Sequence, residues 1–248
     1  MNLPNAITLA RIAMTPALAV LAFVDAWEAR LVAFVLFLVA AITDHVDGSL
    51  ARSRGQVTDL GRLLDPLADK LLLLATLLPM YLLAGSGLSW SLASPLREAL
   101  VPGVLGPMVP LTDAFGSAAF PLALPGGLRL GLPLWIVVVV LGREVAMTIF
   151  RQIAARRGVV IAAIGPAKWK MGMQFTWIGA AYFWFFAATL AAEQGWTAQA
   201  WTMFAYFNGI VGLVAMVAAV ALTLYSLALY GARYGYLLRG ASRASTNR

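Results

Sequence analysis

The sequence predicts an all-α polytopic membrane protein with six transmembrane helices. Of its 248 residues, 61% are hydrophobic and 12% are charged, whereas soluble domains are about 45–50% apolar and about 25% charged. The mean hydropathy is +0.83. Apolar runs of about 20 residues, long enough to cross a bilayer as a helix, recur along the chain. The alternating short segments of a transmembrane barrel are not found.

Six apolar spans are expected, separated by polar turns. An amphipathic start over residues 2–16 leads into a span that ends near Val24, and the turns are expected at 25–30, 54–58, 165–170 and 194–199. The other spans are expected at about 31–53, 60–84, 134–153, 171–191 and 204–230. We assign 1–235 to one transmembrane domain and 236–248 to a basic, disordered tail.

Residues 85–130 interrupt this pattern. They are rich in Gly, Pro and Ser, and six prolines within them rule out one continuous helix. We expect an extended external loop with short interfacial or re-entrant pieces.

The net charge of +7 does not indicate nucleic-acid binding, because the cations stand at the ends of apolar spans. Only Arg30, Arg97 and Arg129 fall in loops on one side of a six-span arrangement. The other side holds Arg52, Arg54, Arg62, Arg151, Arg156, Arg157, Lys168, Lys170, Arg233, Arg239, Arg243 and Arg248. The positive-inside rule therefore predicts a bacterial-type cytoplasmic membrane protein with both termini at the cytoplasmic face.

Four aspartates lie at the cytoplasmic ends of the second and third spans: Asp44, Asp47, Asp65 and Asp69. Asp44 and Asp47 are three residues apart, and Asp65 and Asp69 are four residues apart. On a helix, either spacing places both members of a pair on one face. Carboxylates at membrane depth are costly and need a cation or a function. A structural ion-pair cluster with Arg52, Arg62 and Lys70 is the alternative, but the acids outnumber these bases.

Only hard cations suit such a site. The chain has no cysteine and one histidine, His45, so a thiolate site, a histidine metal site and a serine triad are excluded. Oxygen ligands favour Mg²⁺, Mn²⁺ or Ca²⁺. Four carboxylates suit two ions about 4 Å apart, which can orient a diphosphate.

Small residues beside the acids favour a ligand that approaches the helices closely. Gly48 and Ala51 lie on the second span, Gly61 lies on the third, and Arg52 could hold phosphate oxygens. The residues alone thus predict a metal-dependent site for a diphosphate-containing substrate at the cytoplasmic surface.

The same stretch fits the pattern D-x2-D-G-x2-A-R-x8-G-x3-D-x3-D at every fixed position, from Asp44 to Asp69. This resembles the signature of the CDP-alcohol phosphatidyltransferase family, whose fold has six spans. Four further segments resemble the members that use sn-glycerol 3-phosphate as acceptor: NLPNAITLARIAMTP at 2–16, LLDPLADK at 63–70, GREVAMTIFRQ at 142–152 and GPAKWK at 165–170.

The resemblance implies transfer of a phosphatidyl group from CDP-diacylglycerol to sn-glycerol 3-phosphate. It also implies two Mg²⁺ or Mn²⁺ ions as cofactors. Metal would be held by Asp44, Asp47, Asp65 and Asp69, and Asp69 would also be the general base. The CDP part would contact Asp44, Gly48, Ala51, Arg52 and Gly61. The phosphate of the acceptor needs a cationic pocket, for which Arg143, Lys168, Lys170 and Arg11 are the candidates, with Arg151 behind them.

Two alternatives stay open at this point. One is the same family with another acceptor, namely serine, inositol phosphate or phosphatidylglycerol. The other is a cation-coupled transporter, which would require acids near the bilayer midplane and broken helices in inverted repeats. The expected partners are the two substrates and membrane lipids, with no nucleic acid, and the resemblance suggests a homodimer.

Overall fold

The computed structural model describes residues 3–53, 59–84, 123–124, 128–129, 132–159 and 165–236. Within them lie the helices α1 (Leu3–Phe23), α2 (Trp27–Ser53), α3 (Asp59–Ala84), α6 (Leu134–Arg156), α7 (Gly165–Gln194) and α8 (Gln199–Tyr234). The strands β1 (Ala123–Leu124) and β2 (Leu128–Arg129) form a small antiparallel pair. The predicted helical class is confirmed, with this strand pair as the exception among the described residues.

Four of the described helices are long and apolar enough to cross a membrane. The candidate spans are Asn5–Phe23, Leu64–Leu83, Trp169–Gln194 and Gln199–Tyr234. Helices α2 and α6 are not among them, and α6 carries the charged pair Arg143 and Glu144 near its middle. The count of six transmembrane helices therefore stays a prediction.

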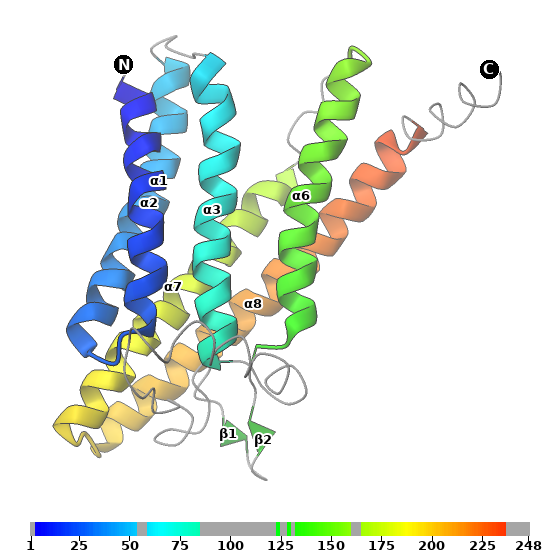
Figure 1. The fold of residues 1–248 in the computed structure, drawn as a ribbon. Helices are drawn as coiled ribbons and strands as arrows, with labels where there is room; N and C mark the ends of the chain where they lie inside the picture. The colour runs from blue at the N-terminus through cyan, green and yellow to red at the C-terminus, as the bar shows by residue number, and fades with distance from the viewer. Residues whose placement is uncertain are drawn as a thin grey trace.

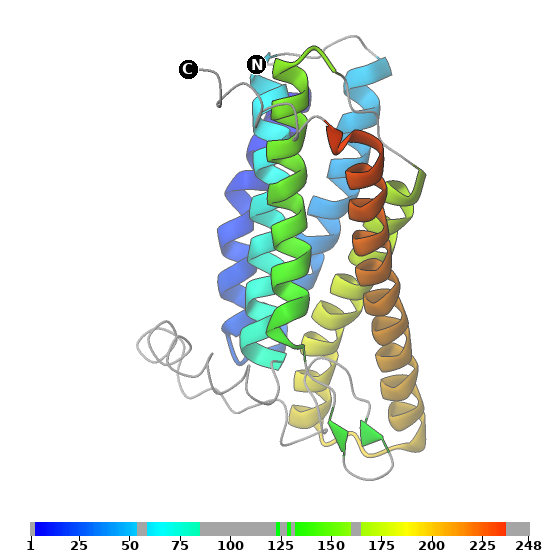
Figure 2. The ribbon, with the colours of Figure 1, turned by 90° about the vertical axis from the view of Figure 1, so that its right-hand side faces the viewer.

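The helices form a bundle in which α1 packs on α2 and α3, and α7 packs on α2 and α8 (Figure 1). Helix α6 lies against α3 and α8. The start of α1 and the end of α8 lie at the end of the bundle where α2 ends and α3 begins, as a view turned by 90° also shows (Figure 2). The strand pair lies at the opposite end of the bundle.

One predicted turn is helical in the structure, and another is shorter than predicted. The turn predicted at 165–170 is wrong, because α7 begins at Gly165. Pro166 is compatible with this start, since the first turn of a helix does not use its backbone N–H groups as internal donors. The turn predicted at 25–30 is also too long, because α2 begins at Trp27.

Arg30, predicted in an external loop, is buried inside the bundle. It forms an ion pair with Asp25 at 3.2 Å and donates a hydrogen bond to Thr189 of α7. Its side chain is 1% exposed, so it anchors the start of α2 to α7 instead of marking a solvated loop.

The core around α7 brings α2 and α7 close together. Trp177, Tyr182 and Trp184 are fully buried there, and the Tyr182 hydroxyl donates to the Ala75 carbonyl oxygen at 3.2 Å. A Cβ atom at Gly179 would lie 3.4 Å from the Phe37 ring. Small residues allow such close helix packing in membranes, and α2 and α7 each contribute side chains to one cavity, among them Asp44 and Lys170.

Candidate active site

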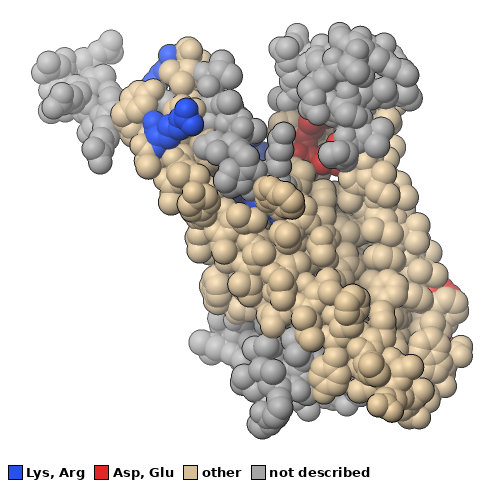
Figure 3. Space-filling view, turned by 180° about the vertical axis from the view of Figure 1, so that it is seen from behind, with Lys and Arg blue, Asp and Glu red and all other residues tan. Residues whose placement is uncertain are grey.

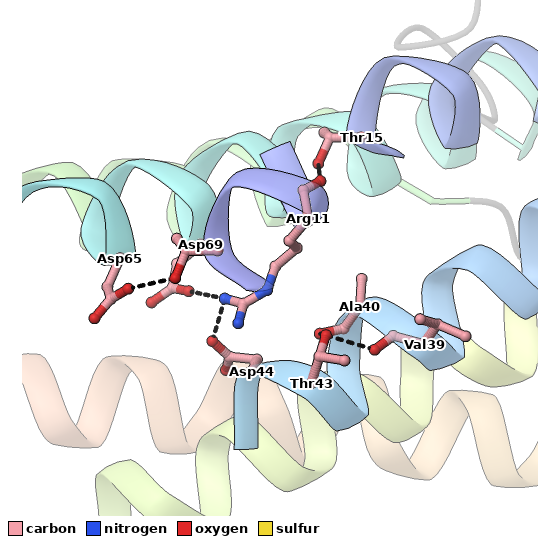
Figure 4. Close-up of polar contacts among 9 residues, drawn as sticks. Arg11, Thr15, Val39, Ala40, Thr43, Asp44, Asp65 and Asp69 are labelled. Carbon is pink, nitrogen blue, oxygen red and sulfur yellow. Dashed lines mark hydrogen bonds and ion pairs between the residues drawn. The ribbon is translucent and has the colours of Figure 1, made fainter. Parts of the chain in front are cut away.

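The guanidinium of Arg11 bridges two of the predicted metal ligands. Its Nη1 atom lies 2.5 Å from a carboxylate oxygen of Asp44 and 3.4 Å from one of Asp69. These side chains point toward one another from α1, α2 and α3 (Figure 4). The Arg11 side chain is 1% exposed, whereas those of Asp44 and Asp69 are 18% and 50% exposed.

The remaining described acid of the cluster is also tied to α1. The hydroxyl of Thr8 donates to an Asp65 carboxylate oxygen at 3.0 Å. Thr8 and Arg11 are three residues apart on α1, and Asp65 and Asp69 are four apart on α3, so each pair occupies one helix face. Helix α1 therefore forms a third wall of the acidic site, which the sequence motif alone did not include.

The aspartates open into a cavity of about 80 Å³. It is lined by Asp44 from α2, Asp69 and Lys70 from α3, Glu144 from α6, and Lys170 and Gln174 from α7, together with apolar side chains. Acidic atoms are visible at the edge of a surface hollow when the protein is seen from behind (Figure 3). The cavity joins the acidic cluster to the predicted acceptor-phosphate residue Lys170.

The cationic side of this cavity is organised around Glu144. Its carboxylate accepts hydrogen bonds from Arg143 Nη1 at 2.9 Å and from the Lys170 ammonium. Arg143 also donates through Nη2 to the Ser226 hydroxyl of α8 at 3.2 Å. Both cationic side chains are 7% exposed, so α6, α7 and α8 meet at one partly desolvated charge cluster.

Several predicted site residues have only their backbone described. Asp47, Gly48, Ala51 and Arg52 lie in the last turns of α2, and Lys168 lies in the first turn of α7. Their side chains lie outside the described part of the structure. Gly61 is buried near the start of α3.

Among the described residues, no group of three possible ligands is close enough to define a metal site. Asp44 and Asp69 converge on one positive charge, that of Arg11. Carboxylate oxygens are the donors that Mg²⁺ and Mn²⁺ prefer. The donor set and its attraction for a cation thus agree with the predicted cofactor class.

Three polar side chains at the site were not among the predicted site residues. Thr8 and Glu144 lie inside segments that carry the family resemblance, at 2–16 and 142–152. Thr8 lies three residues before Arg11 and Glu144 follows Arg143, and these positions could have indicated that both belong to the site. Gln174 is buried one turn beyond Lys170 on α7, and helical spacing from Lys170 would have indicated it.

The bundle contains helices long and apolar enough to cross a membrane, and carboxylate and ammonium groups line one cavity within it, as suits a membrane protein that binds a charged ligand. The family description "CDP-alcohol phosphatidyltransferase" matches residues 1–103 and 108–225. The chain therefore belongs to the CDP-alcohol phosphatidyltransferase family, which is a family of enzymes.

Curated relatives share about a third of their aligned residues with this chain. A Mycobacterium tuberculosis protein named "Probable phosphatidylglycerophosphate synthase" is 32% identical over 72% of this chain and 64% of its own length. A Bacillus subtilis "CDP-diacylglycerol--glycerol-3-phosphate 3-phosphatidyltransferase" is 31% identical over 72% of this chain and 75% of its own. The Arabidopsis thaliana protein named "CDP-diacylglycerol--glycerol-3-phosphate 3-phosphatidyltransferase 2" is 30% identical over 70% of this chain and 60% of its own length. The chain thus spans less than two thirds of the length of the mycobacterial and plant relatives.

Proposed function

We propose that this protein transfers the phosphatidyl group of CDP-diacylglycerol to sn-glycerol 3-phosphate, giving phosphatidylglycerol phosphate and CMP. The observation that supports this best is the continuous cavity that joins Asp44 and Asp69 to Lys170. An acidic end suits a metal-bound diphosphate, and a cationic end suits the phosphate of the acceptor. The names of the relatives agree with this acceptor.

Asp69 is the proposed general base. It lines the cavity together with Asp44, whereas Asp65 does not. Asp44 is the less suitable of the two, because it is 18% exposed and lies 2.5 Å from Arg11, while Asp69 is 50% exposed. A carboxylate must reach the acceptor hydroxyl to remove its proton, and Asp69 is the acid with that access.

In the proposed reaction, Asp69 accepts the proton of the acceptor hydroxyl through a carboxylate oxygen. The acceptor oxygen forms a bond to the β-phosphorus of CDP-diacylglycerol, and the bond from that phosphorus to the bridging oxygen breaks. CMP leaves with the bridging oxygen. General-base help of this kind contributes about 10²–10⁴-fold to the rate.

Mg²⁺ or Mn²⁺, in two sites, would be held by Asp44, Asp47, Asp65 and Asp69. When bound, the ions supply charge neutralisation for the diphosphate and the leaving group. Arg52, with Gly48, Ala51 and Gly61, is proposed to bind the CDP part beside Asp44. These assignments come from the family resemblance, and the convergence of Asp44 and Asp69 on Arg11 supports a cation position between those two acids.

The acceptor's phosphate is proposed to bind Arg143, Lys168, Lys170 and Arg11. Lys170 lines the cavity, and Arg143 is linked to Lys170 because both donate hydrogen bonds to the Glu144 carboxylate. Arg11 lies at the acidic end, where it could reach a phosphate only if its contacts with Asp44 and Asp69 change. We further propose a homodimer in the cytoplasmic membrane with the site and both termini facing the cytoplasm, as the cation distribution predicts.

The test is an acceptor panel with purified protein, CDP-diacylglycerol and Mg²⁺, in which CMP release is measured. We expect release with sn-glycerol 3-phosphate and none with serine, inositol phosphate or phosphatidylglycerol. Release with one of those acceptors instead would retain the family reaction and replace the proposed acceptor. Metal-dependent cation uptake into liposomes without nucleotide would favour a transporter.

A further inference from the structure

The carboxylate of Glu144 lies between two cations that the proposed function assigns to the acceptor's phosphate. It accepts from Arg143 at 2.9 Å and from Lys170. A negative group in an anion pocket opposes the ligand's charge, so its presence needs a physical reason. The proposed function assigns Glu144 no role of its own.

The connections of α6 supply the first part of that reason. Helix α6 packs on α3 and α8, and Glu144 is the α6 residue that lines the cavity. Its contact with Lys170 therefore ties α6 to α7 across the cavity by side chains. Arg143, one residue earlier, donates through Nη1 to Glu144 and through Nη2 to Ser226 of α8.

The charges in the cavity supply the second part. Lys170 shares the cavity with Asp44 and Asp69. An ammonium group there is attracted to any free carboxylate within reach, because charges are only partly screened inside a protein. Glu144 is the carboxylate that Lys170 contacts. Among the described residues, the other acids that line the cavity are Asp44 and Asp69.

We infer that Glu144 is a positioning residue that holds Arg143 and Lys170 together as the acceptor-phosphate pocket and keeps Lys170 away from Asp44 and Asp69. The inference rests on the proposed function for the identity of the acceptor. The two cations are ordered before the acceptor arrives, which lowers the cost of ordering them on binding. Glu144 does not touch the reacting atoms, so its effect is on acceptor binding and not on the chemical step.

The test compares Glu144→Gln with the unchanged protein by steady-state kinetics. Gln keeps the size of the side chain and removes its charge. We expect the KM for sn-glycerol 3-phosphate to rise about tenfold, which corresponds to about 1.4 kcal/mol. The kcat and the KM for CDP-diacylglycerol should change by less than about twofold, a difference below about 0.5 kcal/mol.

A matched control is Glu193→Gln, the same change at an exposed position near the far end of α7. It should leave all three constants unchanged. The melting temperature of each variant in detergent checks folding, and Glu144→Asp replaces Glu144→Gln if the latter does not fold. Glu144→Asp keeps the charge on a shorter side chain, so a rise in the same KM is again expected.

Three results would overturn the inference: an unchanged KM for the acceptor, a lower KM, or a fall in kcat alone. A lower KM would mean that Glu144 only repels the ligand. Binding of inorganic phosphate, measured by calorimetry on both proteins, separates this inference from the proposed function. If sn-glycerol 3-phosphate is not consumed by the unchanged protein, the proposed function fails, while weaker phosphate binding by Glu144→Gln still supports the positioning role.

Discussion

Arg11 and Asp44 are in close contact at the acidic site, with Nη1 of the arginine 2.5 Å from the carboxylate. Arg11 comes from the first helix and Asp44 from the second, 33 residues later. The same guanidinium reaches Asp69 of α3. One buried cation thus holds together carboxylates that would otherwise repel one another, and this arrangement leads to the first prediction.

Replacing Arg11 with Met should destabilise the protein most when no divalent metal is present. Removing one partner of a buried ion pair costs about 3–5 kcal/mol, and the lower end is expected because Asp69 is half exposed. We expect a lower melting temperature in EDTA and a smaller loss in excess Mg²⁺, since a bound cation replaces the missing charge. Arg151→Met, at an exposed position of α6, is the control. An equal loss with and without Mg²⁺ would count against a shared cation position.

Replacing Thr8 with Val should weaken the site without disrupting the fold. The change keeps the shape of the side chain and removes the hydrogen bond to Asp65. A hydrogen bond of this kind contributes about 1 kcal/mol, so we expect kcat/KM to fall about fivefold at saturating metal. Thr15→Val removes a hydroxyl that bonds only to the Arg11 carbonyl oxygen in the described contacts, and it should retain activity. A Thr8→Val enzyme with normal kcat/KM would show that Asp65 needs no support from α1.

The close approach of Gly179 to Phe37 limits the size of the side chain that fits at position 179 between α2 and α7. A Cβ atom at Gly179 would lie 3.4 Å from the Phe37 ring, so Gly179→Ala should be tolerated. Gly179→Leu should destabilise by about 1–3 kcal/mol, because a larger side chain forces the helices apart. Melting temperatures of both variants in detergent test this, with Gly172→Leu as a control because a Cβ atom there meets nothing within 4 Å. A stable Gly179→Leu protein would mean that the helices can separate freely.

Metal removal should abolish turnover reversibly. The acids converge on a cation position, and a diphosphate brought near uncompensated carboxylates is repelled. We expect no CMP release after dialysis against EDTA and recovery on addition of Mg²⁺ or Mn²⁺. Undiminished release in EDTA would contradict the proposed cofactor.

Much of this arrangement could be predicted from the sequence, because hydrophobic run length and helical spacing are local properties. The course of α2 and α3 and the helical phase of Asp65 and Asp69 follow from such patterns. The helical start of α7 was missed because Gly165 and Pro166 are typical of turns, although proline is also compatible with a first helical turn.

Contacts between segments that are far apart in the sequence could not be predicted from such local patterns. Arg11 shares an end of the bundle with the aspartates only because α1 packs on both α2 and α3. The burial of Arg30 depends on Thr189, which lies 159 residues away. Whether Glu144 turns to Arg143 alone or also to Lys170 depends on how α6 and α7 are placed, which no local pattern specifies.

The central claim is that Asp69 removes the proton from the acceptor hydroxyl, and CMP release by Asp69→Asn measures it most directly. Asparagine has nearly the same size but cannot accept that proton. We predict that kcat falls by at least about 100-fold, the lower limit for general-base catalysis, while the melting temperature and CDP-diacylglycerol binding are retained. Normal CMP release by Asp69→Asn would contradict the assignment of the base and the mechanism that depends on it.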